Sequence, residues 1–118
     1  MNITVAITGA SGAIYPQRFL NHLAAEPSVS RIQLVVSAAG LRVLSEELGG
    51  SVTQNSIVQR LVDDCREKIE LLNNNDIGAS IASGSFPVDA MVVVPCSVGT
   101  LGSIAHGISR DLIQRSAD

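Results

Sequence analysis

The stretch ITGASGAIY, residues 7–15, holds the residues whose types and spacing best suit ligand binding. Gly9 and Gly12 flank Ala10 and Ser11, directly after an apolar run and directly before a helix-like pattern. Backbone N–H groups at a helix N-terminus, together with the positive end of the helix dipole, favour an anion, and Ser11 adds a hydroxyl donor. The spacing therefore predicts a phosphate cradle in this loop.

Residues that the loop lacks exclude some classes of phosphate ligand. It has no Gly-Lys-Ser/Thr ending, and Lys68 is the only lysine in the chain, which excludes an ATP-hydrolysing P-loop. The G-x-G-x-x-G spacing is absent, and Ser37 stands where a ribose-binding acid is expected, which disfavours NAD. Further serines at Ser37, in the SGS of residues 83–85 and at Ser97 favour a mononucleotide such as FMN.

The elements that must position these residues alternate between strand-like and helix-like patterns. Near-continuous apolar runs predict strands, and apolar residues spaced three and four apart predict helices. A strand at Ala90–Pro95 is expected to be covered on both faces. The pattern predicts an α/β domain with a Rossmann-like (flavodoxin-like), doubly wound parallel sheet in three layers, with strands at 3–7, 32–36, 69–72 and 90–95 and helices at 14–25, 38–48 and 57–62.

Composition sets further bounds. The chain has 118 residues, of which 46% are hydrophobic and 16% charged, so residues 1–118 are expected to form one domain with a buried core. A net charge of −3 without a basic cluster argues against nucleic acid and against an anionic membrane surface. No apolar run approaches the roughly 20 residues of a membrane span, and the N-terminus does not resemble a signal peptide, so a cytoplasmic location is expected. Cys65 and Cys96 are expected to be free thiols, with no metal site.

Five ordered motifs resemble the flavin prenyltransferase (UbiX) family, whose members were formerly named aromatic acid or 3-octaprenyl-4-hydroxybenzoate decarboxylases. They are GASGAIY at 9–15, the segment 37–47, ASGSF at 82–86, PCSVGTL at 95–101 and LIQRSAD at 112–118. The resemblance implies that FMN binds, without a metal, at a subunit interface of a homo-oligomer that is often a dodecamer. It implies transfer of a dimethylallyl group from dimethylallyl phosphate to N5 and C6 of reduced FMN, and a UbiD-type decarboxylase as recipient of the product.

The resemblance also assigns roles by position. Glu47 matches the active-site glutamate, where a carboxylate would relay the proton that leaves the flavin ring. The flavin-contacting positions are Gly9, Ala10, Ser11, Gly12, Ser37, Ser97 and Arg115, and the positions beside the flavin and the prenyl group are Ala82 and Ser83. The family's phosphate-binding lysine, arginines and tyrosine have no counterpart before Asp118. The sequence also stops within a helix-like pattern, so we expect it to be the N-terminal part of a longer chain.

Several alternatives remain open at this point. Ser11 could simply cap the first helix, and without the motif register Glu47 reads as a surface acid. Cys96 reads as a small core residue, and His22 and His106 read as surface or capping residues. For the whole chain, the alternatives are an FMN-dependent decarboxylase of the cysteine decarboxylase superfamily and a truncated, non-catalytic FMN-binding domain. An NAD-dependent reductase is the least favoured.

Overall fold

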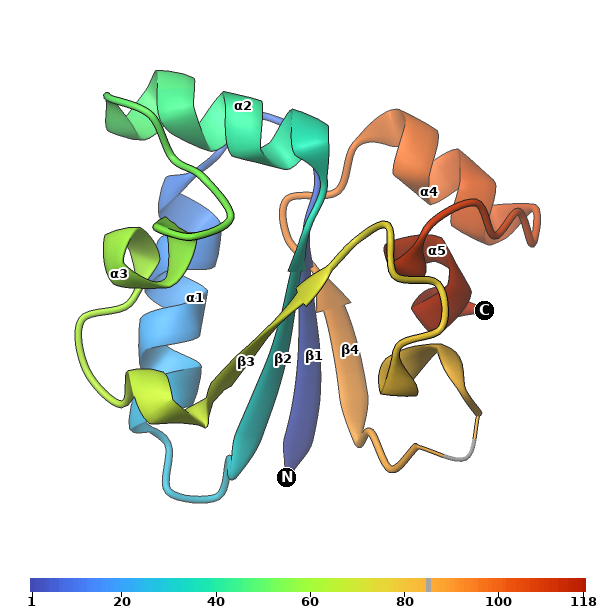
Figure 1. Ribbon diagram of the computed structural model, residues 1–118, viewed down its shortest axis with the longest axis horizontal. Helices are drawn as coiled ribbons and strands as arrows, with labels where there is room; N and C mark the ends of the chain where they lie inside the picture. The colour runs from blue at the N-terminus through green and yellow to red at the C-terminus, as the bar shows by residue number, and fades with distance from the viewer. Residues whose placement is uncertain (85) are drawn as a thin grey trace.

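The computed structural model describes residues 1–84 and 86–118 and shows a parallel four-stranded sheet with helices on both faces (Figure 1). The sheet order is β3-β2-β1-β4, and every pairing is parallel. Ile7 pairs with Val36, and Ala6 pairs with Val93. The carboxyl ends of β2, β1 and β4 therefore meet at one edge of the sheet. The strands are β1 (Asn2–Ile7), β2 (Arg31–Val36), β3 (Ile69–Asn73) and β4 (Ala90–Val93).

Helices cover the two faces unequally. On one face α1 and α3 lie against the sheet, with α2 crossing above the carboxyl edge, while α5 and the short turn η2 lie against the other face (Figure 1). The helices are α1 (Ile14–Ala25), α2 (Ala38–Leu48), α3 (Ile57–Leu61), α4 (Val98–Ala105) and α5 (Leu112–Ala117), and the 3₁₀ turns are η1 (Arg66–Lys68) and η2 (Ser80–Ala82). Among the described residues, no helix is long and apolar enough to cross a membrane.

Alternation along the central strands divides the core in two. Odd-numbered residues of β1 and even-numbered residues of β2 face α1 and α3, and the opposite set faces η2 and α5. The larger cluster includes Val5, Leu34, Leu20, Leu44 and Ile57, and the smaller one includes Ala6, Val35, Ile81, Leu112 and Ile113. Both faces of β1 and β2 are therefore buried, which is why these strands read as continuous apolar runs.

The predicted fold class is confirmed, and so are the bounds of the first two helices at 14–25 and 38–48. Gly49 ends α2 with φ 81°, a backbone conformation that glycine adopts without strain. The expectation that the strand at 90–95 is covered on both faces is wrong. β4 is an edge strand with only half-buried or exposed residues, and α4 buries none of its own.

The order of the strands creates a switch point in the sheet. From β1 the chain proceeds to β2 and β3 on one side, and it then returns to place β4 on the other side of β1. In open parallel sheets, ligands bind in the crevice outside the carboxyl ends of the strands at such a point. The loops that follow β1 and β4 flank this position, and both carry residues that the sequence singled out.

Candidate functional site

Glu47, near the end of α2, accepts hydrogen bonds from several groups of the loop that follows β1. Its Oε2 accepts a hydrogen bond from the Ser11 hydroxyl at 2.7 Å. Its Oε1 accepts from the backbone N–H of Ala13 at 2.7 Å and from that of Gly12 at 3.0 Å. A carboxylate from the far end of α2 thus occupies donors at the beginning of α1, although Glu47 itself is exposed. The adjacent Glu46 is also exposed.

This contact changes the predicted role of the first loop. Ala13 is the N-cap of α1 and makes no side-chain cap, while the Ser11 hydroxyl donates to Glu47 rather than capping the helix. A phosphate seated on the Gly12 and Ala13 N–H groups would have to displace a carboxylate of the same charge. The phosphate cradle at this loop stays a prediction, and the structure adds Glu47 as an anion that holds these donors.

The pKa of Glu47 is lowered from its ordinary value of 4.5 by the N–H of Ala13, the hydroxyl of Ser11 and the N–H of Gly12. Because the folded pKa lies below the unfolded one, the contact stabilises the fold above pH 4.5 and is lost as the pH falls through the folded pKa. We expect the difference in unfolding free energy between wild type and Glu47→Gln, measured with urea, to shrink at these low pH values. A difference that stays constant across the titration would contradict the contact, and Glu46→Gln serves as the control.

Thr8 joins the two loops that flank the switch point. It is 2% exposed, and its hydroxyl donates to the Pro95 carbonyl at 2.8 Å while accepting from the Ser97 N–H at 2.7 Å. The Thr8 N–H also donates to the Pro95 carbonyl at 3.1 Å. The sequence analysis missed this residue, and its only signal was a small polar side chain at the end of a buried strand.

Replacement of Thr8 by Val should destabilise the fold, because the isosteric side chain leaves the partly buried Ser97 N–H without its acceptor. We expect a loss of about 1–3 kcal/mol in unfolding free energy, measured by urea titration. Thr8→Ser keeps the hydroxyl and should lie much closer to wild type. Equal stability of the Val and Ser variants would show that the hydroxyl bridge is not what joins the loops.

Ser37 and Ser97 both cap helices at the carboxyl edge. The Ser37 Oγ accepts from the Gly40 N–H at 2.9 Å at the start of α2, and the Ser97 Oγ accepts from the Thr100 N–H at 3.2 Å at the start of α4. The first loop reaches α2 directly, because a Cβ added at Gly9 would lie 2.6 Å from the Cβ of Ala39. The structure thus brings the first loop, Ser37 and Ser97 to one edge, as the strand order requires.

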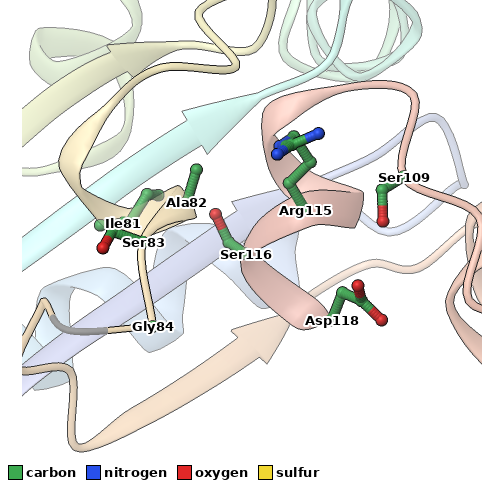
Figure 2. A pocket seen from close by; sticks show the side chains of 8 residues that line it. All are labelled: Ile81, Ala82, Ser83, Gly84, Ser109, Arg115, Ser116 and Asp118. Carbon is green, nitrogen blue, oxygen red and sulfur yellow. The ribbon is translucent and has the colours of Figure 1, made fainter.

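Arg115, Ala82, Ser83 and Gly84 meet in a separate pocket. Its volume is about 400 Å³, with the η2 segment on one side and α5 on the other (Figure 2). Arg115 is exposed, and Ser116 of the same helix lies opposite Ala82 across the opening (Figure 2). The described residues that line it are Ile81, Ala82, Ser83, Gly84, Ser109, Arg115, Ser116 and Asp118. The pocket joins three predicted residues, and the sequence analysis missed Ser109, Ser116 and Asp118.

The remaining candidates fall outside these groups. Burial raises the pKa of the half-buried Cys96 thiol, which disfavours the thiolate that a nucleophile needs. Cys65 and Cys96 are free, as expected. Within residues 1–84 and 86–118, no three His, Cys, Asp or Glu side chains are grouped to hold a metal. Ser85 of the predicted SGS loop lies outside the described residues.

Curated relatives resemble the chain along its whole length. A flavin prenyltransferase UbiX from Methanocaldococcus jannaschii is 40% identical over 118 residues, which are 100% of this chain and 58% of the relative. The flavin prenyltransferase LpdB from Lactiplantibacillus plantarum is 42% identical over 116 residues, which are 98% of this chain and 57% of the relative. The chain therefore spans somewhat more than half the length of these proteins.

Solved structures share the fold. AnUbiX (PadA1), in complex with FMN and dimethylallyl pyrophosphate, is 37% identical with a TM-score of 0.78, over 99% of this chain and 56% of that one. A dodecameric FMN-dependent UbiX-like decarboxylase from Escherichia coli O157:H7 is 34% identical with a TM-score of 0.83, over 100% of this chain and 59% of that one. The sequence matches the Flavoprotein family over residues 1–118. The chain belongs to the Flavoprotein family, and the relatives that it resembles within it include flavin prenyltransferases of the UbiX type.

Proposed function

We propose that residues 1–118 form an FMN-binding domain of a flavin prenyltransferase, which joins a dimethylallyl group from dimethylallyl phosphate to reduced FMN. The observation that carries this proposal is the meeting of the first loop, Ser37 and Ser97 at the carboxyl edge beside the β1/β4 switch point, with Glu47 hydrogen-bonded to Ser11. The relative solved with FMN and dimethylallyl pyrophosphate supports the choice of ligands.

The donors at this edge fit the phosphate of FMN. A phosphate dianion seeks N–H and hydroxyl donors, and helix N-termini supply N–H groups that have no acceptor inside the helix. Because Glu47 already holds the N–H groups of Gly12 and Ala13, we place the phosphate at the beginnings of α2 and α4, where Ser37 and Ser97 each cap one N–H group and the other N–H groups of the first turn have no acceptor within the helix. The first loop is then left to contact another part of the cofactor.

The residues of the chain supply part of what the reaction requires. Reduced FMN, when bound, supplies the nucleophilic N5 and C6 atoms. Departure of an allylic phosphate leaves a phosphate dianion and an electron-poor carbon, so the site needs a cation near the former and apolar walls near the latter. Arg115 brings positive charge to the pocket formed with Ile81 and Ala82. Glu47, ionised at neutral pH, can accept the departing ring proton on a carboxylate oxygen.

We further propose that the active form is a homo-oligomer and that its product serves a UbiD-type decarboxylase. The dodecameric relative supports the assembly. Exposed apolar side chains on α4 also favour it, because Val98 is 87% exposed and Leu101 is 60% exposed. We also propose a cytoplasmic location, as the sequence analysis expects.

The proposed transfer is tested by anaerobic incubation of the purified chain with reduced FMN and dimethylallyl phosphate, followed by mass spectrometry of the extracted flavin. We expect a flavin heavier by one isoprene unit, and none when dimethylallyl phosphate is omitted. Retained but unmodified FMN would contradict the transfer. That result would favour either the FMN-dependent decarboxylase alternative, which accords with the description of the Escherichia coli relative, or a non-catalytic FMN-binding domain.

A further inference from the structure

Tyr15 lies over the first loop in a way that no role so far explains. A Cβ added at Gly12 would lie 2.8 Å from Cδ2 and 3.2 Å from Cε2 of the Tyr15 ring. The Cδ2–Cε2 edge of the ring therefore lies against the bare Cα of Gly12, and a side chain at position 12 would displace it. Side chains in the first turn of a helix lean back over the preceding residues, which accounts for the direction of the ring.

Most of Tyr15 is open to solvent. Tyr15 is 66% exposed, although the same loop also carries Ser11 and the Glu47 contact. The other two aromatic residues of the chain are committed to the core, since Phe19 packs against the larger cluster and Phe86 against the smaller one. Tyr15 is thus the aromatic ring that remains available at the candidate site.

A flat aromatic ligand is the partner that such a surface suits. Aromatic faces prefer offset stacking, and a tyrosine buries its ring face while its hydroxyl stays in contact with water. The isoalloxazine ring of FMN is flat and aromatic, and the first loop is free to contact it if the phosphate lies at Ser37 and Ser97. The Ser11–Glu47 pair would then stand beside the same ring.

We infer that Tyr15 is a binding residue whose exposed face stacks on the isoalloxazine ring, while Gly12 leaves room for the Cδ2–Cε2 edge of the tyrosine ring against the loop. This inference rests on the proposed binding of FMN. It gives two reasons for a glycine at position 12. The backbone there has a φ of 118°, and the missing side chain leaves room for the ring that contacts the cofactor.

The test uses the fluorescence of bound, oxidised FMN. A tyrosine in contact with a flavin quenches its emission by electron transfer, whereas phenylalanine does not. Tyr15→Phe should keep FMN binding but make the bound flavin severalfold brighter than in wild type. Tyr15→Ser should also weaken FMN binding by about tenfold, since the stacked face is lost. Ile14→Ser is the matched control, because Ile14 is an exposed neighbour that lines a groove on the outer side of α1.

The outcomes separate this inference from the proposed function. If wild type binds no FMN, the result contradicts both the proposed function and the stacking of Tyr15. If FMN binds and its brightness is the same in wild type and Tyr15→Phe, the stacking is overturned while FMN binding stands. A change of molecular mass in Tyr15→Ser, with unchanged flavin emission, would place Tyr15 in a contact between copies and would also overturn the inference. Far-UV circular dichroism checks that each variant is folded.

Discussion

Ser11→Asp should abolish FMN binding, with a loss of affinity of about 100-fold or more. The Ser11 hydroxyl lies 2.7 Å from Glu47 Oε2, so an aspartate there would set two carboxylates against each other in the loop that contacts the cofactor. Like charges at this distance either repel or force one group to take up a proton. Glu47 would then release the Gly12 and Ala13 N–H groups that it holds.

Ser28→Asp is a matched control for Ser11→Asp, because Ser28 lies in the turn between α1 and β2, away from the carboxyl edge of the sheet. Ser28 is exposed, and its hydroxyl also donates to a glutamate, Glu26 Oε1, at 3.1 Å. Ser28→Asp makes the same change of charge next to the same kind of partner, but outside the first loop. Titration of both variants with FMN should show a loss in Ser11→Asp alone. Equal binding by the two would remove the first loop from the cofactor site.

Glu47→Gln should leave FMN binding intact while slowing formation of the prenylated flavin by roughly 10²–10⁴-fold, the usual contribution of a general acid or base. Glutamine keeps one oxygen that can accept from the Ala13 N–H, so the first loop should hold its shape. It cannot accept the proton that leaves the flavin ring. The rate is measured by mass spectrometry of flavin extracted at successive times.

Glu46→Gln is the companion variant, because Glu46 is adjacent and exposed but makes no contact with the first loop among the hydrogen bonds of the described residues. It should react at the wild-type rate. A Glu47→Gln variant that turns over as fast as Glu46→Gln would leave Glu47 with a structural role only. Loss of FMN binding in Glu47→Gln would likewise show that its contacts shape the binding site rather than the chemistry.

The elements of the fold could be predicted because local patterns determine them. The helix at 14–25 has apolar residues on one side, and the helix at 38–48 begins at a serine cap and ends at Gly49, so both bounds are confirmed. The exposure of β4 could not be predicted in the same way. An apolar run of four or five residues reads as buried, and only the order of the strands shows that this one lies at the edge.

The contacts of the candidate site depend on tertiary structure. Glu47 reads as a surface acid from its own helix, and only its register in a family motif pointed to the site. Its partners lie more than thirty residues earlier in the chain, so no local pattern shows that it holds Ser11, Gly12 and Ala13. Thr8 is a similar case, since its hydroxyl joins β1 to a loop 87 residues away. Serine caps such as Ser37 and Ser97 involve only residues close in the chain, so a local pattern can predict them.

The central claim, that the carboxyl edge beside β1 and β4 holds FMN by its phosphate, is tested most directly by equilibrium dialysis of the purified chain against FMN and, separately, riboflavin. The account predicts that the chain retains FMN, and that it retains riboflavin far more weakly, because riboflavin has no phosphate for the N–H groups at the beginnings of α2 and α4 to bind. Retention of neither flavin, or equal retention of both, would contradict it.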